Sequence, residues 1–437
     1  MKLKISTTAI ALVVFQGTAG ASGFALIENS ASGMGNAFAG AGAIGEDAST
    51  IWFNPAGMMK LDSNQIVAAG HYIHPEASFD NQGSTTAAGT SLTGGDDDGG
   101  KDAFIPNFYW VTAINEEMKF GLGVNAPFGL ETEYDDDWVG RYHAVTSDMK
   151  TININPSIAY QASEKLSLGG GLNIMLADVN LTNAIDFGSL IGAPQTADGF
   201  ADLSADNMNG IDDLSYGFNL GLMYDITPAT TLGLAYRSEM DIDVDGKARF
   251  RVPTDAAPVL GTGAFQKSAI EASVTLPQSF SVGIAHNVNK LTLLADITWT
   301  GWDSFDELRI KYANPDQPDS VTTESWDNSF RYSIGANWQY NKKITLRTGL
   351  AYDETPIPDS EHRTPRIPGN DRTWLSFGGT YHINEDFTVD VGYSHLFIDD
   401  TDINNTFESS QPALAATLKG EYEASVDILS AQLRWNY

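Results

Sequence analysis

The stretch TININPSIAYQ, Thr151 to Gln161, alternates apolar and polar side chains with a period of two. One face of the predicted strand carries Ile152, Ile154, Ile158 and Tyr160, and the other carries Thr151, Asn153, Asn155, Ser157 and Gln161. Such a strand separates an apolar from a polar environment. The same alternation returns at 166–176, 330–339 and 344–353. Because a soluble β-sandwich alternates as well, these strands predict an all-β fold without deciding between a sandwich and a barrel.

The connections between the alternating segments favour a barrel. Short polar turns lie near 115–117, 162–164, 226–228, 287–289, 340–342 and 383–386. Long polar connections lie between them, around 79–103, 129–150, 180–213, 246–267, 314–323, 355–370 and 399–419. This strict alternation is typical of outer-membrane barrels, which have short periplasmic turns and long outer loops. The six turns and seven loops predict a fourteen-stranded antiparallel transmembrane β-barrel with both termini in the periplasm.

The two ends of the chain agree with this prediction. The last segment, LSAQLRWNY, alternates and finishes on the aromatic Tyr437. The first 21 residues combine two lysines, a short apolar run and the small residues Ala19-Gly20-Ala21, which indicates a cleaved secretory signal. The apolar run is shorter than the roughly 20 residues that a spanning helix needs. We therefore expect an exported chain that begins at Ser22.

Composition excludes several kinds of function. The chain has 56 Asp and Glu against 25 Lys and Arg, a formal net charge of −31, so nucleic acid is not an expected partner. The hydrophobic content of 42% argues against a disordered chain. The absence of Cys excludes thiolate metal sites and disulfides. The acidic run Asp96-Asp97-Asp98 lacks the spacing of an EF-hand, so we expect neither a metal nor a cofactor.

Aromatic residues near the predicted strand ends suit the two interfacial girdles of a membrane barrel. The candidates are Tyr72, Trp110, Trp299, Trp302, Trp374 and Tyr381. Trp374 is in the inward phase of its strand, so we expect it to face the lumen instead.

Further segments resemble the FadL-type outer-membrane transporters of long-chain fatty acids and other hydrophobic molecules. They are SGFALIENSASGMGNAFAGAGAIGEDASTIWFNPAGM near the start, then NAPFG, WVGRYHA, NINPSIAY, LPQSFSVGIAH, TWTGWDSFDEL and RIPGNDRTWLSFGGTYHINEDFTVDVGYSHLF, in this order. The resemblance covers nearly the whole chain after the signal segment. It implies that residues 22–61 fold inside the lumen as a hatch and that residues 62–437 form the barrel.

The resemblance also assigns roles within the hatch, to Phe24, Trp52, Phe53, Asn54, Pro55 and Ala56. Phe24 matches an aromatic residue near the mature N-terminus that occupies the binding pocket in the family. Trp52 and Phe53 would fill gaps against the wall, and Pro55 would favour one stable turn. The alternative for 54–57 is a plain link between a tail and the first strand.

Two more features of the family have counterparts in the sequence. The outer loops 129–150 and 180–213 carry Trp138, Tyr142, Phe187 and Leu190, which would line a hydrophobic outer groove or, alternatively, pack on one another to cap the barrel. In the predicted third strand, Pro127 cannot donate to a ladder. The ladder is therefore expected to lapse in the segment Asn125, Ala126, Pro127, Phe128 and Gly129, and the resemblance implies a kink there that opens a lateral exit. The alternative is a strand that simply ends before a loop.

Inward-phase arginines are candidates for binding a carboxylate. They are Arg237, Arg331 and Arg347, with Arg434 as a fourth. A buried guanidinium that stays unpaired until a ligand arrives would favour an anion. The alternative is that these arginines pair with neighbouring acids in a polar lumen.

Together these features predict a monomeric, passive transporter in the outer membrane of a Gram-negative bacterium. The expected partners are long-chain fatty acids or other hydrophobic small molecules, together with outer-membrane lipid and lipopolysaccharide. An aromatic hydrocarbon channel of the same family and a general diffusion porin remain alternatives. We expect no enzyme, because Ser376 and His382 lack the rest of a hydrolase constellation.

Overall fold

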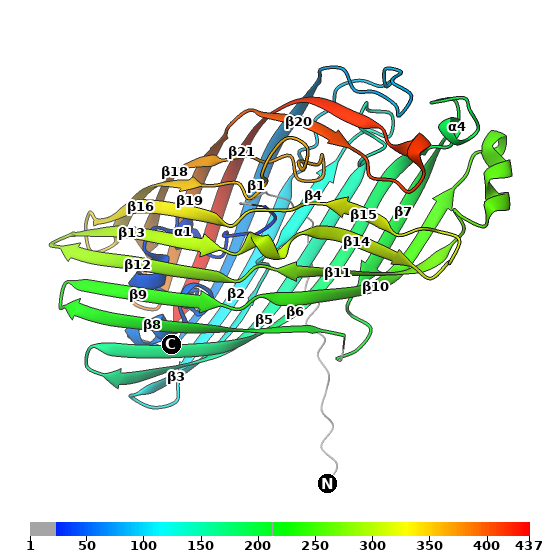
Figure 1. The fold of residues 1–437 in the computed structure, drawn as a ribbon. Helices are drawn as coiled ribbons and strands as arrows, with labels where there is room; N and C mark the ends of the chain where they lie inside the picture. Colours follow the sequence, from blue (N-terminus) through cyan, green and yellow to red (C-terminus); the bar gives the residue numbers. More distant parts are fainter. Residues whose placement is uncertain (1–22, 212) are drawn as a thin grey trace, which may run out of the picture.

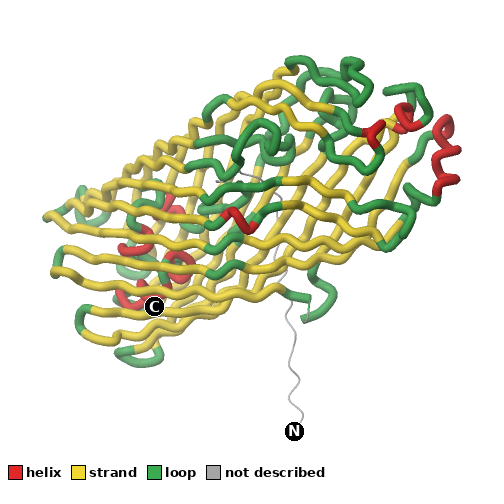
Figure 2. Tube along the Cα trace, viewed as in Figure 1, coloured by secondary structure: helices red, strands yellow, loops and turns green. Residues whose placement is uncertain are grey.

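The computed structural model describes residues 23–211 and 213–437 as a single barrel with short helices in its lumen (Figure 1). The expected signal segment, 1–21, and the expected mature N-terminus, Ser22, lie outside these residues. The first described elements are the short helices α1 (Ala31–Met34), α2 (Ala41–Ile44), α3 (Thr50–Phe53) and η1 (Pro55–Lys60). Figure 2 shows them enclosed by strands near the end of the barrel that carries the short turns.

The strands follow in chain order. They are β1 (Gln65–Asn81), β2 (Ala103–Ala113), β3 (Met118–Asn125), β4 (Gly129–Glu133), β5 (Thr146–Ser163), β6 (Leu166–Asp186), β7 (Asp198–Asp206), β8 (Ser215–Thr227), β9 (Thr230–Arg237), β10 (Met240–Arg251), β11 (Ser268–Leu276), β12 (Ser279–Val288), β13 (Leu291–Thr300), β14 (Glu307–Tyr312), β15 (Ser320–Thr323), β16 (Ser329–Gln339), β17 (Ile344–Asp353), β18 (Arg372–His382), β19 (Phe387–Ile398), β20 (Thr401–Thr406) and β21 (Thr417–Asn436). The connections contain α4 (Phe187–Leu190), η2 (Thr254–Thr262), η3 (Trp302–Ser304) and η4 (Pro412–Leu414).

In the described part of the chain, these 21 strands make fourteen antiparallel passes, because seven passes are each divided in two. The divided passes are β3/β4, β7/β8, β9/β10, β11/β12, β13/β14, β15/β16 and β19/β20. For example, β3 and β4 both pair with β5. The barrel closes because β1 pairs with β21 from Gln65↔Asn436 to Asn81↔Gly420. The predicted fourteen-stranded barrel is confirmed.

The two faces of the wall are inverted relative to a soluble protein. On β5, the polar residues Thr151, Asn153 and Asn155 are buried, whereas Ile158 and Tyr160 on the opposite face are each 44% exposed. Polar side chains inside and apolar side chains outside are the arrangement of a membrane barrel. The period-two pattern therefore separates a polar lumen from lipid. No helix among the described residues is long and apolar enough to cross a membrane.

The outward apolar band ends at an aromatic row on the side of the long loops. The ladders place Tyr236, Phe280, Trp299 and Phe330 side by side on four neighbouring passes. This row is the kind of girdle that was predicted, but Trp302 is not part of it. Trp302 is fully buried inside the barrel, because its pass leaves the sheet between β13 and β14 and turns inward. Trp374 is fully buried as well, as its inward phase predicted.

Several strands extend beyond their expected ends toward the long loops. Two predicted loops are shorter than expected, because β6 continues to Asp186 and β10 to Arg251. The strand β7 lies within the predicted 180–213 connection. Neighbouring strands supply backbone partners there, so the ladder continues although the outward side chains have become polar.

Candidate functional site

An apolar cavity of about 90 Å³ lies in the barrel where the inward faces of β7, β10, β11 and β14 converge. Its lining is almost entirely apolar and includes Phe24, Leu203, Val244, Ile270 and Ile310. Most of these residues belong to a single buried cluster. Among the residues that the structure describes, the charged lining residues are Glu324 and Arg366. The cavity therefore suits an apolar group that carries one polar end.

Glu324 follows β15 and is 4% exposed. Its Oε2 accepts a hydrogen bond of 3.0 Å from Nε1 of Trp326. Burial raises the pKa of Glu324 to about 8, so its carboxyl is largely neutral at pH 7. A neutral carboxyl can donate a hydrogen bond to an anion.

Arg366 supplies the cationic counterpart of this end of the cavity. It lies in the connection between β17 and β18 and reaches across the lumen to the other side of the barrel. Its Nη1 donates to Oγ of Ser147 at 2.9 Å, and its Nη2 donates to the carbonyl of His143 at 3.0 Å. A guanidinium stays cationic in proteins, so it can neutralise a ligand carboxylate.

Phe24 closes the cavity with an aromatic cluster. Its ring lies 4.8 Å from Trp302, 5.4 Å from Phe305, 5.8 Å from Trp326 and 6.0 Å from Phe128, measured between ring centroids. The side chain is 3% exposed. The first described hatch residues therefore fill the lumen beside this cavity.

The segment that carries Phe24 also occupies the break in the third pass. Asn125 ends β3 and Gly129 begins β4, so 126–128 are outside the ladder. Leu26 N donates to Pro127 O at 2.7 Å, and Gly129 N donates to Phe24 O at 3.0 Å. Ala25 and Phe128 thereby form an isolated antiparallel bridge. A short piece of hatch backbone thus substitutes for the missing strand pairing.

A second cavity, of about 250 Å³, lies at this break. It is lined by inward residues such as Leu26 and Ala177 and by the outward residues Phe104, Ile152 and Leu176. Residues from both faces of the wall therefore line this cavity. On β6, the outward series changes from Leu176 to Asp178, so the cavity lies at the outer edge of the apolar band.

Asn54 anchors the body of the hatch to the wall. Its Nδ2 donates to the carbonyls of Gly42, Leu222 and Leu234 at 2.6, 3.1 and 3.2 Å. Its Oδ1 accepts from the backbone N of Ala56 at 3.1 Å, which begins η1 at Pro55. The three carbonyls come from the hatch, β8 and β9.

Glycines on the inward face let the hatch backbone approach the wall. A Cβ at Gly169 would meet the backbone N of Ala56, and one at Gly221 would meet Oδ1 of Asn54. Trp52 and Phe53 are both half-buried, and Phe53 packs against Phe38 at 5.6 Å between ring centroids. At these two glycines the hatch therefore packs against a wall that presents no side chain.

The three predicted carboxylate partners all contact the hatch. The guanidinium of Arg237 lies 3.4 Å from the ring centroid of Trp52 and donates to the carbonyl of Trp52 at 2.7 Å. Arg331 donates to the carbonyl of Ala37 at 2.9 Å. These two arginines therefore donate hydrogen bonds to backbone carbonyls of the hatch.

Arg347 is part of a buried ionic network. Its Nη1 donates to Glu46 at 2.7 Å, its Nη2 also contacts Glu46, and Asp390 lies 3.5 Å away. Arg434 donates to the carbonyl of Glu46 at 3.1 Å. Burying Arg347 requires such pairing, since an unpaired buried charge is strongly destabilising. Among the described lining residues of the apolar cavity, none is one of these four arginines.

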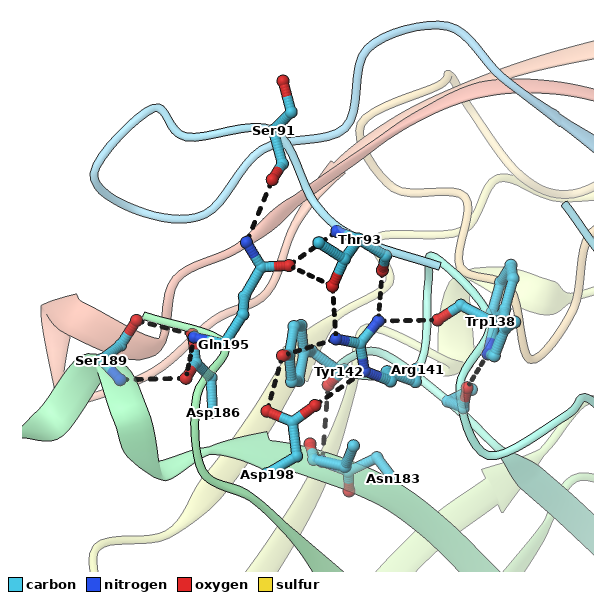
Figure 3. A network of polar contacts seen from close by, with 12 residues as sticks. Ser91, Thr93, Trp138, Arg141, Tyr142, Asn183, Asp186, Ser189, Gln195 and Asp198 are labelled. Atoms are coloured by element: carbon cyan, nitrogen blue, oxygen red, sulfur yellow. Dashed lines mark hydrogen bonds and ion pairs between the residues drawn. The ribbon is translucent and has the colours of Figure 1, made fainter. Parts of the chain in front are cut away.

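The predicted outer-groove residues lie mainly inside the packed loops. Trp138 stacks on Tyr134 with ring centroids 4.0 Å apart, and its Nε1 donates to Ala144 O at 2.8 Å. Figure 3 shows Arg141 and Tyr142 converging on Asp198, at 3.0 and 2.8 Å. Trp138 and Tyr142 are 1% and 3% exposed. The alternative in which these loops cap the barrel therefore describes these two residues.

Phe187 and Leu190 belong to α4, at the far end of the same loop region. Phe187 is fully buried against Phe265, at 4.9 Å between ring centroids, and Leu190 is half-buried. A groove of about 90 Å³ does open among the loops, and Tyr142 is the predicted residue that lines it. Its other apolar lining residues include Ile185, Phe250, Phe265 and Leu414.

The charged end of the apolar cavity was not predicted from the residue patterns. Arg366 begins the segment RIPGND, a loop without periodicity, so the sequence does not indicate which way its side chains point. Glu324 follows the four-residue strand β15. Only long-range packing brings the two residues to one cavity.

Comparisons with known proteins agree with this architecture. The model of a family described as outer membrane protein transport protein (OMPP1/FadL/TodX) matches residues 12–437. The chain is 31% identical over 437 residues to the long-chain fatty acid transport protein of Escherichia coli (strain K12), covering 93% of this chain and 96% of that protein. It is 30% identical over 426 residues to outer membrane protein P1 of Haemophilus influenzae, covering 90% of each.

Solved structures show the same fold. A Pseudomonas aeruginosa FadL homologue superposes with a TM-score of 0.86 at 23% identity, covering 94% of this chain and 99% of that chain. The Pseudomonas putida toluene transporter TodX superposes with a TM-score of 0.68 at 18% identity, covering 95% of this chain and 99% of that chain.

Proposed function

Because the chain belongs to the FadL family of outer-membrane transport proteins, we propose that it carries long-chain fatty acids across the outer membrane without an energy source and releases them through the barrel wall. The family consists of transporters and channels of the Gram-negative outer membrane, not of enzymes. In this chain, Ser376 and His382 hydrogen-bond to Ser394 and Thr388, not to each other.

One observation carries the proposal. The segment Phe24–Leu26 lies between the apolar cavity and the cavity at the break in the third pass, since Phe24 lines the first and Leu26 lines the second. A ligand that displaces Phe24 would also break the two hydrogen bonds to Pro127 and Gly129. Occupation of the pocket and opening of the lateral route are then a single event.

The charged end of the cavity supports a fatty acid as the ligand. Arg366 would neutralise the carboxylate, and the neutral carboxyl of Glu324 would donate to it. An aromatic hydrocarbon, the alternative substrate class, would leave both groups without a ligand partner. Relatives of both kinds exist, including the long-chain fatty acid transport proteins and the toluene transporters.

The loop groove is the proposed site of first capture. It lies among the outer loops and combines apolar residues such as Phe250 and Leu414 with a polar margin from 408–411. A shallow mixed surface suits transient binding of an amphipathic molecule before it enters the barrel. A general diffusion porin is disfavoured because the hatch contacts the inward faces of several strands.

A disulfide across the isolated bridge tests lateral release. The flanking hydrogen bonds make Ala25 and Phe128 a non-hydrogen-bonded antiparallel pair, whose Cα atoms lie about 4.5 Å apart in regular sheets. That separation is within the range of disulfides, about 4.4–6.8 Å. The chain has no native Cys to compete. We expect the A25C/F128C variant to take up fatty acid when reduced and to stop when oxidised.

The single variants A25C and F128C under the same oxidant are the controls. Fatty-acid uptake by cells that lack their own transporter, expressing each variant, is the readout. If the oxidised double variant transports as fast as the reduced one, the Phe24–Leu26 segment does not gate release. Loss of uptake in the reduced protein would be assigned to the Phe128 substitution by the single variant.

A further inference from the structure

The outward face of β10 carries a charge pattern that transport does not use. Its exposed residues alternate with inward apolar ones and are all charged. In order toward the loops they are Asp241, Asp243, Asp245, Lys247, Arg249 and Arg251. The inward residues Ile242, Val244 and Ala248 belong to the apolar cluster around the cavity, which fixes the phase of the strand. The acidic half is therefore nearer the membrane and the basic half farther from it.

The position of this face is set by the aromatic row below it. In Figure 1, β10, β11 and β14 continue the passes of β9, β12 and β13 toward the loops. Tyr236, in the aromatic row, lies just before β10. Lys247 lies six residues beyond Asp241, which at about 3.3 Å per residue and a strand tilt of about 40° is roughly 15 Å farther from the membrane.

The basic half, which we call the basic strip, consists of Lys247, Arg249, Arg251 and Lys267. Lys267 joins it because Ala248↔Ser268 is the last pair of the β10–β11 ladder, and all four side chains are exposed. Arg249 pairs with Asp202 at 3.3 Å. Arg251 lies over the ring of Phe200, at 4.5 Å from its centroid. The strip thus combines four positive charges with one paired acid, in a chain with a net charge of −31.

We propose that the basic strip binds the anionic sugar headgroup of lipopolysaccharide in the outer leaflet. The strip faces away from the barrel on the loop side of the lipid-contacting band, beyond the acidic half of β10. Its neighbour is therefore the outer part of the headgroup layer of the surrounding lipid. In the Gram-negative outer leaflet this layer is an oligosaccharide with phosphate and carboxylate groups. Exposed Lys and Arg side chains bind such groups through charge and hydrogen bonds.

The acidic half of the strand distinguishes this lipid from a simple phospholipid. Asp241, Asp243 and Asp245 lie next to the membrane surface, where they would repel a phosphate at that depth, whether of a glycerophospholipid or of the lipid anchor of lipopolysaccharide. A headgroup must extend past these acids to reach Lys247. An oligosaccharide several sugars deep does so, and its outer anionic groups then meet the basic strip.

The test compares two matched triple variants of the full-length, detergent-purified protein. K247A/R251A/K267A removes the unpaired part of the strip and leaves the Arg249–Asp202 pair. K290A/K342A/K343A also removes three positive charges, from exposed residues in two short turns at the opposite end of the barrel. The probe is purified rough lipopolysaccharide, and binding is measured by native mass spectrometry. We expect the strip variant to bind about 100-fold more weakly, since each basic residue near an anionic surface contributes roughly 1 kcal/mol.

Three further outcomes decide the proposal. Equal losses in the two triple variants would show that only net charge matters and would overturn it. Equal binding of phosphatidylglycerol by the wild-type protein would also overturn it, because the strip would then not recognise an extended anionic saccharide. Wild-type affinity should fall steeply as salt increases, which tests the charge contribution without any variant. Retained fatty-acid binding by the strip variant shows that the barrel is folded.

Discussion

Replacing Phe24 by Ala should strengthen the binding of a long-chain fatty acid. The Phe24 ring is 3% exposed and contacts four other aromatic rings at 4.8–6.0 Å between centroids. Truncating a buried Phe to Ala typically removes about 3–5 kcal/mol of packing. The two backbone hydrogen bonds of the segment each add only about 1 kcal/mol. Without the ring, the Phe24–Leu26 segment should therefore leave its docked position readily.

The magnitude follows from competition for one pocket. If docking of the Phe24 ring is favourable by about 3 kcal/mol, the pocket is open in roughly one molecule in 150. Competition with the Phe24 ring therefore raises the apparent Kd of the wild-type protein for fatty acid about 150-fold, and F24A removes most of this competition. We expect a 10- to 100-fold lower Kd, allowing for contacts that the ligand loses with the ring.

Equilibrium dialysis of radiolabelled oleate against detergent-purified protein measures this affinity. Hydrogen exchange of the backbone amides of Leu26 and Gly129 should accelerate in parallel, because both donate across the bridge. The control is F53A, which removes a hatch ring that packs against Phe38, away from the cavity. An unchanged or weaker affinity in F24A would refute the competition between Phe24 and ligand.

Four other outcomes are expected. The folded-state pKa of Glu324 is raised to about 8, so the affinity of the wild-type protein for fatty acid should be greatest below that pH and fall as pH rises through it. In the same dialysis assay, E324Q should bind fatty acid independently of pH between 7 and 9. The stability contributed by neutral Glu324 is present below the unfolded-state pKa of about 4.5 and is lost progressively until pH reaches the folded-state pKa of about 8. The melting temperature of the wild-type protein should therefore fall more steeply between these two pH values than that of E324Q, and a parallel decline in both proteins would contradict the assignment. N54A removes the side chain that donates to the carbonyls of Gly42 and Leu222, so it should weaken the docking of the hatch by about 2–4 kcal/mol. We expect the N54A barrel to conduct ions in planar bilayers, whereas N436A, a change at a strand end, should not. G169V should leak as well, because its side chain would meet the backbone of Ala56, and a tight G169V barrel would show that the hatch can shift.

Much of the fold follows from local patterns. Alternation in segments such as 151–161 predicts strands with two faces, and the alternating connection lengths predict the number of passes and their closure. The break at Pro127 is also visible locally, because Pro has no N–H for a ladder. These features depend on the local alternation of side chains and on backbone chemistry, so they can be predicted from a single sequence.

The partners of each polar side chain depend instead on contacts between distant parts of the chain. Arg347 and Glu46 are 301 residues apart, and Arg366 and Ser147 are 219 apart. Alternation shows that Arg347 points inward, but not that the hatch has already supplied its counter-charge. The amino-acid sequence by itself therefore determined the barrel fold, which side chains point into the lumen, and the interruption of the third strand at Pro127. Only the tertiary structure decided which arginines hold the plug and which one lines the cavity, because pairing is a property of positions in space and not of spacing along the chain.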